Sequence, residues 1–521
     1  MSVAWALAWE QGTAVAPSLG SGAGVPMPSG SGGGGVPREV VEEVASLKHQ
    51  IEELSRQVGA ASGGPTKLEL FHGYLGVFII AFAVALLATP VMRRLAIRFG
   101  VVDRPSEARK LHRIPVAYMG GVSVYLGLLA AVLFSYTAPL HGLVTFHPSK
   151  FSEDGFLPGG VPISIVLGMT VIMIVGLLDD VLKISPRVKV GGQLFAAAAL
   201  AIEDVGVKVA GAIVPIAKAV GTPTVTIKGV ETLGFIINLG GHEVPIDLVY
   251  WIGTGIIAVF VIGACNASNL IDGLDGLLSG TTAIASIGLL MVALTLAAGD
   301  DGPRDASRII LCLGLLGACL GFLPHNFNPA TIFLGDAGSL LLGFVTIVIV
   351  LTLGDTGKTH LVLAGLIIYA VPIIDTTLAI IRRKVSGRRI SDADDQHLHH
   401  MLKRALGVKG AVLALYGIAA GFGVLGVALS EGRGRVTYAL ALVFAAFMGV
   451  TSFKIARREQ IEKQARGVED PTPRREGKRG SAGTLAAKAD AGGAHTGAAN
   501  TGGGKETSGA ERGPEASPAG G

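Results

Sequence analysis

Charged residues are scarce in this sequence. Asp, Glu, Lys and Arg make up 16% of its 521 residues, whereas a soluble domain carries about a quarter. Hydrophobic residues make up 50%, and the mean hydropathy is +0.56. This balance excludes a soluble globular protein. Apolar runs recur from near Gly73 to about Phe453, and the length that a helix needs to cross a bilayer predicts an all-α polytopic membrane protein with about eleven transmembrane helices.

Cysteine is also rare. The three cysteines, Cys265, Cys312 and Cys319, all lie in or beside apolar runs. Their spacing is not that of metal ligands, and three residues make no disulfide framework. We therefore expect them to be small residues packed inside membrane helices.

The two ends of the chain lack long hydrophobic runs. Residues 11–37 are rich in Gly, Ser and Pro, a composition typical of disorder, and Arg38–Val58 carries a short heptad stripe. That helix could lie against its own membrane domain or form a homodimer, and both interpretations stay open because short isolated helices are marginal in water. Beyond Lys454 the chain is first basic and then of low complexity. The predicted domains are an outside segment at 1–70, a membrane domain at 71–453 and a cytoplasmic tail at 454–521.

Lys and Arg are unevenly distributed between the loops. The first loop holds seven of them between Arg93 and Arg113, whereas Lys150 is the only one in the next loop. Basic loops stay on the cytoplasmic side, so we expect the N-terminus outside and the C-terminus in the cytoplasm. The segment from Gly206 to Asp247 then lies outside, and its β-branched runs predict a small β-hairpin.

Acidic residues stand at the ends of apolar runs, where ionisable groups are costly and usually mark a function. Asp179 and Asp180 are followed closely by Lys183 and Arg187, a pattern that suits a Mg²⁺ or phosphate site. The alternative is an interfacial acidic pair without a partner.

A second polar segment contains Asn266, Asn269, Asp272 and Asp275, each three residues after the last. If a helix begins there, Asp272 and Asp275 share one face, and the two amides suit recognition of a base or a sugar. The alternative is a turn that caps the next helix.

Two further clusters complete the candidate site. Asp336 follows Phe333 and Gly335, and its structural alternative is to cap a helix that starts at Ser339. A later basic loop carries three histidines, a cluster that suits a diphosphate: His397, His399 and His400. A zinc site there is less favoured, because no cysteine is near and the spacing suits a tetrahedral metal poorly.

These segments, taken in order, resemble the polyprenyl-phosphate N-acetylhexosamine-1-phosphate transferase superfamily, the glycosyltransferase 4 family. The matching motifs are Asp103-Arg-Pro with Arg109-Lys110-Leu-His112, Met119-Gly-Gly, Gly176-Leu-Leu-Asp-Asp, Asn266 to Gly276, Asn326-Phe-Asn-Pro-Ala, Phe333 to Ser339 and His397-Leu-His-His. The form of the first motif, the single His-Leu-His-His string and the predicted number of spans favour the WecA/TagO-like branch over MraY.

The resemblance implies a reaction. Such enzymes transfer a sugar-1-phosphate from a UDP-N-acetylhexosamine, here expected to be UDP-GlcNAc, to undecaprenyl phosphate at the cytoplasmic face of the bacterial inner membrane. They release UMP and need Mg²⁺ or Mn²⁺. The implied catalytic residues are Asp179, Asp180, Asp272 and Asp275; the metal ligands are Asp336 and Asp179; and the substrate-binding residues are Lys110, His112, Asn266, Asn269, Phe333, His397, His399 and His400.

Three other functions remain open. An MraY-like enzyme would transfer phospho-MurNAc-pentapeptide instead. A secondary transporter would bury ionisable groups near the bilayer midplane, but here only Asp375 lies well inside an apolar run. An inactive scaffold joined through the heptads is disfavoured by the complete acidic set. We expect membrane lipid as a partner and no nucleic acid.

Overall fold

The computed structural model describes residues 66–103, 116–137 and 160–465. Within the last range it leaves out residues 215–216, 218–220, 228–229, 240–241, 300–303, 356, 386–397 and 433. The chain divides into two units, residues 1–462 and 463–521. The predicted disordered segment, the heptad helix at Arg38–Val58 and the tail beyond residue 465 lie outside the described residues. The homodimer considered for that helix gains no support from the described part of the chain.

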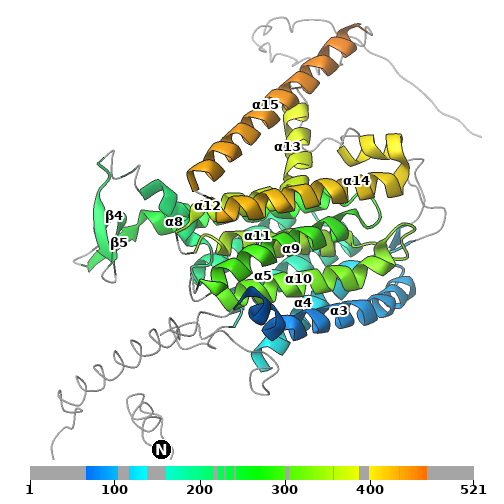
Figure 1. Ribbon diagram of the computed structural model, residues 1–521, viewed down its shortest axis with the longest axis horizontal. Helices are drawn as coiled ribbons and strands as arrows, with labels where there is room; N and C mark the ends of the chain where they lie inside the picture. Colours follow the sequence, from blue (N-terminus) through cyan, green and yellow to red (C-terminus); the bar gives the residue numbers. More distant parts are fainter. Residues whose placement is uncertain are drawn as a thin grey trace, which may run out of the picture. The chain divides into compact units, whose positions relative to one another are not determined.

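The described chain is mostly helical, as predicted (Figure 1). Its α-helices are α3 Lys67–Arg98, α4 Gly120–Thr137, α5 Ile163–Leu182, α6 Pro186–Ile202, α8 Leu248–Ile271, α9 Leu277–Ala298, α10 Asp305–Asn326, α11 Gly335–Thr352, α12 Thr359–Ile368, α13 Ala370–Val385, α14 Leu398–Glu431 and α15 Gly434–Ala465. A 3₁₀ helix, η2, covers Val207–Ile213.

Local sequence explains where several helices begin. Thr66 and Glu69 form a reciprocal capping box at the start of α3, which satisfies two backbone donors that the helix leaves free. Asp247 caps α8 by accepting a hydrogen bond of 3.1 Å from the amide of Tyr250. Pro186 occupies the first turn of α6, a position where its fixed φ favours a helix and its missing N–H costs nothing.

Eight helices are long and apolar enough to cross a membrane, or nine if α12 and α13, which meet at 81°, form one broken span; this count covers the described residues alone. The polytopic helical fold is confirmed. The sequence predicted about eleven spans, and α6 and α15 are the two further apolar helices. α6 has only 17 residues, and the apolar part of α15 continues in the sequence from Gly434 to Phe453.

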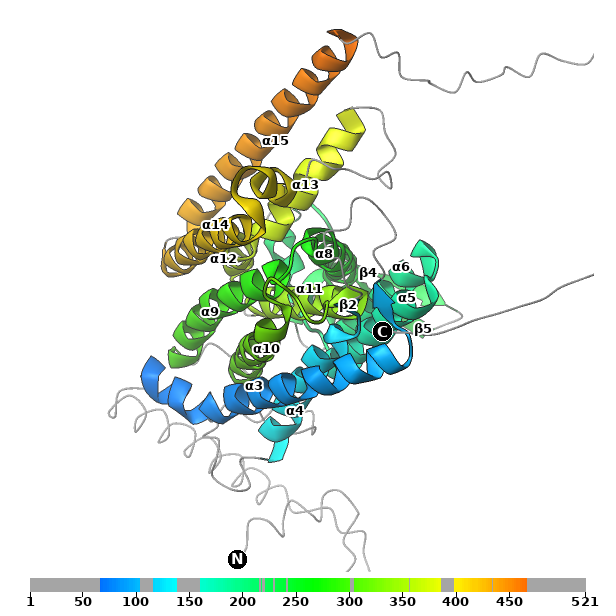
Figure 2. The ribbon, with the colours of Figure 1, turned by 90° about the vertical axis from the view of Figure 1, so that its right-hand side faces the viewer.

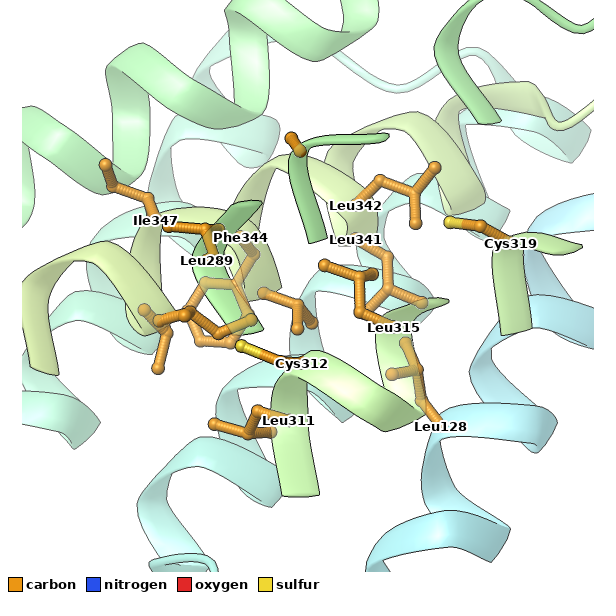
Figure 3. Close-up of a cluster of buried hydrophobic side chains, with 14 of the residues drawn as sticks. Leu128, Leu289, Leu311, Cys312, Leu315, Cys319, Leu341, Leu342, Phe344 and Ile347 are labelled. Carbon is orange, nitrogen blue, oxygen red and sulfur yellow. The ribbon is translucent and has the colours of Figure 1, made fainter. Parts of the chain in front are cut away.

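Helices α10 and α11 form the centre of the bundle. In each helix, 89% of the most apolar stretch is buried inside the protein. α10 packs against α3, α4 and α9, whereas α11 packs against α4, α5 and α8. Cys312 and Cys319 both lie on α10. Figure 3 shows their sulfur atoms among leucine side chains, which include Leu315 of α10 and Leu341 of α11. All three cysteines are free and buried, which confirms their predicted role as small packing residues.

Two small antiparallel sheets interrupt the helices. The strands β3 Thr224–Ile227, β4 Val230–Leu239 and β5 His242–Asp247 form one sheet, in that order, and confirm the predicted hairpin with an added strand. The other sheet pairs β1 Val102–Asp103 with β2 Val116–Ala117. A parallel bridge from Ala117 to Ile332 then joins β2 to the chain before α11.

The helix directions bring several helix ends together. α5 and α8 end, and α6, α9 and α11 begin, on the same side of the bundle, where the acidic clusters of the sequence lie. Figure 2 shows α5, α6, α8 and α11 side by side, and each packs against at least two of the others. Residues far apart in the sequence can therefore meet there.

Candidate active site

A lysine joins two of the predicted acidic clusters. The Nζ atom of Lys189, in the first turn of α6, lies 2.7 Å from Oδ2 of Asp179, in the last turn of α5. The same Nζ atom also contacts Oδ2 of Asp336, in the first turn of α11. The three side chains are 18–24% exposed, so water and small ions can reach them. Two carboxylates thus share one cation at an accessible place.

The amide of Asn269 holds Asp336 from the other side. Asn269 Nδ2 donates to Oδ1 of Asp336 at 2.8 Å and to Oγ of Ser339 at 2.9 Å. One helical turn earlier, Asn266 donates instead to Oε1 of Gln193 at 3.1 Å, which ties α8 to α6. Of the two predicted amides, only Asn269 touches the acidic cluster.

Asp180 faces the backbone and not Lys189. Its Oδ1 and Oδ2 atoms accept hydrogen bonds of 2.8 and 3.0 Å from the amides of Asp336 and Ala337. These amides belong to the free N–H groups at the start of α11, where a negative charge is stabilised. Gly335 has a φ of +71°, and a Cβ atom there would lie 2.5 Å from Asp180 Oδ2. A side chain at position 335 would therefore break this contact.

Asp272 and Asp275 do not share a helical face, so that prediction is wrong. α8 ends at Ile271 and α9 begins at Leu277, leaving both residues in the link between them. Asp275 Oδ2 accepts hydrogen bonds from Nδ2 of Asn328 at 2.8 Å and from the amide of Ala330 at 3.0 Å. Asp275 thereby connects the link to the loop before α11 and does not cap α9, whose N-cap residue is Gly276.

Asp272 lies close enough to the acidic cluster to be affected by its charge. Burial, together with repulsion from Asp336, Asp180 and Asp275, raises the pKa of its carboxyl to about 8. At neutral pH this carboxyl is therefore mostly protonated, unlike an ordinary aspartate.

Phe333 packs against an aromatic residue at the edge of the cluster. Its ring lies 5.9 Å from the ring of Tyr118, at an interplanar angle of 60°. The backbone fixes Phe333 on both sides, because its amide donates to Ala117 O at 2.8 Å and its carbonyl accepts from Gly120 N at 3.0 Å. Burial raises the pKa of Tyr118, as do four carboxylates, those of Asp103, Asp180, Asp336 and Asp272. The Tyr118 hydroxyl therefore stays protonated beside the acidic residues.

One of the predicted histidines reaches the link between α8 and α9. His399 Nδ1 lies 3.1 Å from Oδ2 of Asp375 on α13, and both side chains are almost fully buried. Its other ring nitrogen faces Gly273, where an added Cβ atom would lie 2.7 Å from Nε2. The ring of His400 lies 4.3 Å from that of His399. Lys110, His112 and His397 lie outside the described residues.

The carboxylates present suit a magnesium ion. No group of three or more His, Cys, Asp or Glu side chains is arranged to hold a metal in the described chain. Mg²⁺, however, is commonly held by one or two carboxylates together with substrate phosphates and water. Asp179 and Asp336 already share the ammonium of Lys189, which stands where a bridging cation would bind.

Three residues near the acidic cluster were not among the predicted site residues. Lys189 follows Lys183 and Arg187 in the sequence, and neither it nor Tyr118 was singled out. Asp375 was noted only because it lies inside an apolar run. The signal for Lys189 was Pro186, because a helix that begins there places Lys189 in its first turn.

Comparisons with known proteins agree with this geometry. Residues 162–354 match the sequence pattern of glycosyl transferase family 4. The chain is 31% identical over 375 residues to a probable undecaprenyl-phosphate N-acetylglucosaminyl 1-phosphate transferase of Bacillus subtilis, which covers 72% of this chain and 89% of the relative. It is also 31% identical over 406 residues to a decaprenyl-phosphate N-acetylglucosaminephosphotransferase of Mycolicibacterium smegmatis, covering 73% and 88%.

A relative from the other branch is slightly more distant and has a similar identity over a smaller share of this chain. The phospho-N-acetylmuramoyl-pentapeptide-transferase of Desulforudis audaxviator is 32% identical over 373 residues, which cover 68% of this chain and 97% of the relative. The percentages alone therefore do not separate the two branches. The match extends over nearly the whole length of all three relatives, and the chain belongs to glycosyl transferase family 4, as a membrane-bound sugar-1-phosphate transferase.

Proposed function

We propose that this protein transfers N-acetylglucosamine-1-phosphate from UDP-GlcNAc to undecaprenyl phosphate and releases UMP. The observation that carries the proposal is the pair Asp179 and Asp336, which share the Lys189 ammonium at one end of the bundle. Two relatives whose names contain N-acetylglucosamine and a polyprenyl phosphate support the choice of substrates. The product would begin a lipid-linked glycan of the cell envelope.

In this proposal the residues around Asp336 align two anionic substrates. Phosphoryl transfer needs little covalent help from a protein, and it depends mainly on positioning and on neutralising negative charge. Lys189, partly exposed between the carboxylates, is placed to turn its ammonium towards a substrate phosphate. Asp179 is placed to accept the proton of the lipid phosphate, or to act as a transient nucleophile.

A divalent ion would bind between Asp336 and Asp179. Mg²⁺ or Mn²⁺ would polarise the phosphoryl oxygens and neutralise charge on the leaving UMP. Asn269 holds Asp336 in orientation through its 2.8 Å hydrogen bond. Asp180 holds the first turn of α11, which carries Asp336, and acts by positioning.

The remaining predicted residues have distinct roles in the proposal. Phe333, held by Tyr118 and by the backbone, offers a ring face for the uracil. His399 and His400 are placed to contact the diphosphate, with Lys110, His112 and His397. In the proposal, the UDP-sugar binds beside the end of α8 and the link to α9, which carry Asn266, Asp272 and Asp275. We also propose that this end of the bundle faces the cytoplasm of a bacterial inner membrane, because the basic loops adjoin it.

The test is the release of UMP by the purified full-length protein in detergent with Mg²⁺, UDP-GlcNAc and undecaprenyl phosphate. We expect UMP only when the lipid is present, and a lipid-linked sugar in equal amount. UMP release at the same rate with and without the lipid would contradict transfer to a polyprenyl acceptor. Flux of a solute into proteoliposomes without UMP would favour the transporter.

The second candidate substrate is UDP-MurNAc-pentapeptide, supported by the similarity to the Desulforudis audaxviator enzyme. A competition assay with both nucleotide sugars at equal concentration separates the two. We expect at least tenfold greater incorporation of GlcNAc, which corresponds to about 1.4 kcal/mol of discrimination. Preferential incorporation of the pentapeptide sugar would reverse the assignment while leaving the reaction type intact.

A further inference from the structure

The sheet β3–β5 carries exposed apolar side chains on both of its faces. Phe235, Ile236 and Ile237 are consecutive on β4 and are 43%, 53% and 39% exposed. Successive side chains of a strand point to opposite faces, so Ile236 lies on one face and its two neighbours on the other. Near the start of the same strand, Leu233 is only 2% exposed. We call Phe235, Ile236 and Ile237 the apolar triad.

The triad lies at the level where the membrane begins. β5 ends at Asp247 and α8 starts at Leu248. The register pairs Phe235 with Ile246, directly beside this junction. α8 has 24 residues and is therefore about 36 Å long, whereas the hydrocarbon core is about 30 Å thick. Its first turn must then lie close to the interface.

Aromatic residues in that first turn agree with this depth. Tyr250 and Trp251 pack edge to face, with ring centroids 5.7 Å apart, and Trp251 is 61% exposed. Trp and Tyr are enriched at the boundary between hydrocarbon and water. Figure 1 shows the sheet beyond the ends of the helices, beside α8, with its strands crossing the direction of α9, α10 and α14. The strands therefore run roughly parallel to the membrane surface.

The triad exposes apolar side chains on both faces of the sheet. A binding partner must therefore bury both faces, and this requirement separates a protein partner from lipid. A protein partner or a second copy ordinarily packs on one face of a sheet. The interfacial layer of a membrane can surround a thin sheet on both faces, and its water can satisfy the strand edge that β3 leaves open beside the triad. We propose that the β3–β5 sheet is a lipid-binding element, which inserts the apolar triad into the interfacial layer of the phospholipid leaflet opposite the candidate active site.

Spin labels in phospholipid vesicles test this proposal on the full-length protein. The label would be attached at Ile236→Cys, with Ile237→Cys as a second variant on the other face. The chain's own cysteines are buried and should not react. Thr226→Cys, exposed on β3, is the control for water. Val259→Cys on α8, with 70% exposure, is the control for lipid. The vesicles contain phosphatidylcholine and phosphatidylglycerol.

Collision with dissolved oxygen and with a water-soluble nickel chelate gives the outcome. We expect the labels at 236 and 237 to have an oxygen-to-nickel ratio severalfold higher than the label at 226 and lower than the label at 259, which lies about midway along α8. Ratios equal to that at 226 would place the sheet in water and overturn the proposal. Protection from both reagents would show cover by protein and would overturn it as well. UMP release by each labelled variant serves as the check that it folds.

Discussion

The two ends of the helical bundle both carry clusters of carboxylates and cations, but they differ in the exposure of their carboxylates and in the kind of cation. At the candidate active site a lysine joins Asp179 and Asp336, and every side chain is about one-fifth exposed. The opposite end of the bundle lies where α11 ends. This helix has 18 residues and is about 27 Å long. There two arginines replace the lysine.

The opposite cluster is fastened to the backbone. Arg308 pairs with Asp305 at 2.6 Å, and both side chains are at most 2% exposed. The same guanidinium donates to Thr352 O at 3.0 Å. Arg304 pairs with Asp355 at 2.8 Å, and Asp355 accepts from Gly206 N at 3.0 Å. These contacts connect α10, the end of α11 and the chain after α6.

The comparison separates a reactive cluster from a structural one. Arginine offers several fixed donors and holds a buried geometry, whereas lysine is a flexible point charge that can be displaced. Exposure lets a metal or a phosphate replace an internal partner, and burial prevents it. The same residue types are therefore placed to bind the proposed ligands at one end and hold helices together at the other.

The largest effect should come from removing a carboxylate at the reactive end. We expect Asp179→Asn or Asp336→Asn to reduce the rate of UMP release about 10³-fold or more, because the charge that aligns the phosphates is lost. The melting temperature in detergent should change little. Glu431→Gln, on an exposed side chain that is 52% accessible, is the control and should keep full activity. Activity retained by either site variant would remove that residue from the proposed site.

At the structural end, Arg308→Met should act on folding. It leaves Asp305 buried without its cation, which costs about 3–5 kcal/mol. The double variant Arg308→Met with Asp305→Leu should recover much of that loss, because no uncompensated charge remains. Thermal unfolding of the three proteins measures both effects. If the single and double variants were equally unstable, packing and not charge would explain the cluster.

Replacing Lys189 tests whether the cation at the candidate active site can be displaced. Lys189→Gln should bind Mn²⁺ about tenfold more tightly in the absence of substrate, a change of about 1.4 kcal/mol, because an internal cation no longer competes for the carboxylates. The rate of UMP release should fall. Electron paramagnetic resonance of free Mn²⁺ measures the affinity. Lys183→Gln, nearby but exposed, is the matched control with unchanged affinity. Weaker Mn²⁺ binding by the Lys189 variant would refute the competition.

A smaller effect should appear in the pH dependence of stability. The folded protein holds a proton on Asp272 up to about pH 8, whereas an unfolded aspartate loses it near pH 3.9. Stability contributed by this group is therefore present below about pH 4 and lost as pH rises towards 8. Asp272→Asn should flatten that decline. Melting temperatures at pH 6 and pH 8, measured without divalent ions, test it, and an unchanged slope would contradict the shifted pKa.

Much of this arrangement could be predicted from the sequence. Long apolar runs identify membrane helices because the bilayer dictates their length, and acidic residues at their ends identify a site because burying them is costly. Asp179, Asn269 and Asp336 were found in this way, and the structure brings them together. The predicted substrate and metal roles remain proposals.

Other features depend on long-range geometry that a single sequence does not contain. Nothing near Asp180 shows that its partners are amides 156 and 157 residues away. Asp272 and Asp275 do not share a helical face because α8 ends at Ile271 and α9 begins only at Leu277. Lys189 was hidden among neighbouring cations, and only the start of α6 selects it.

The contact between Asp180 and the start of α11 bears on which cations the enzyme can use. Two backbone amides fix the spacing of α5 and α11 before any ligand arrives, so the carboxylates of Asp179 and Asp336 are carried on a stiff frame. Mg²⁺ prefers oxygen ligands at about 2.0–2.1 Å, while Ca²⁺ needs about 2.3–2.6 Å and more of them. If the proposed ion binds between these carboxylates, a frame held in this way would favour the smaller ion, and metal choice would then follow from helix packing.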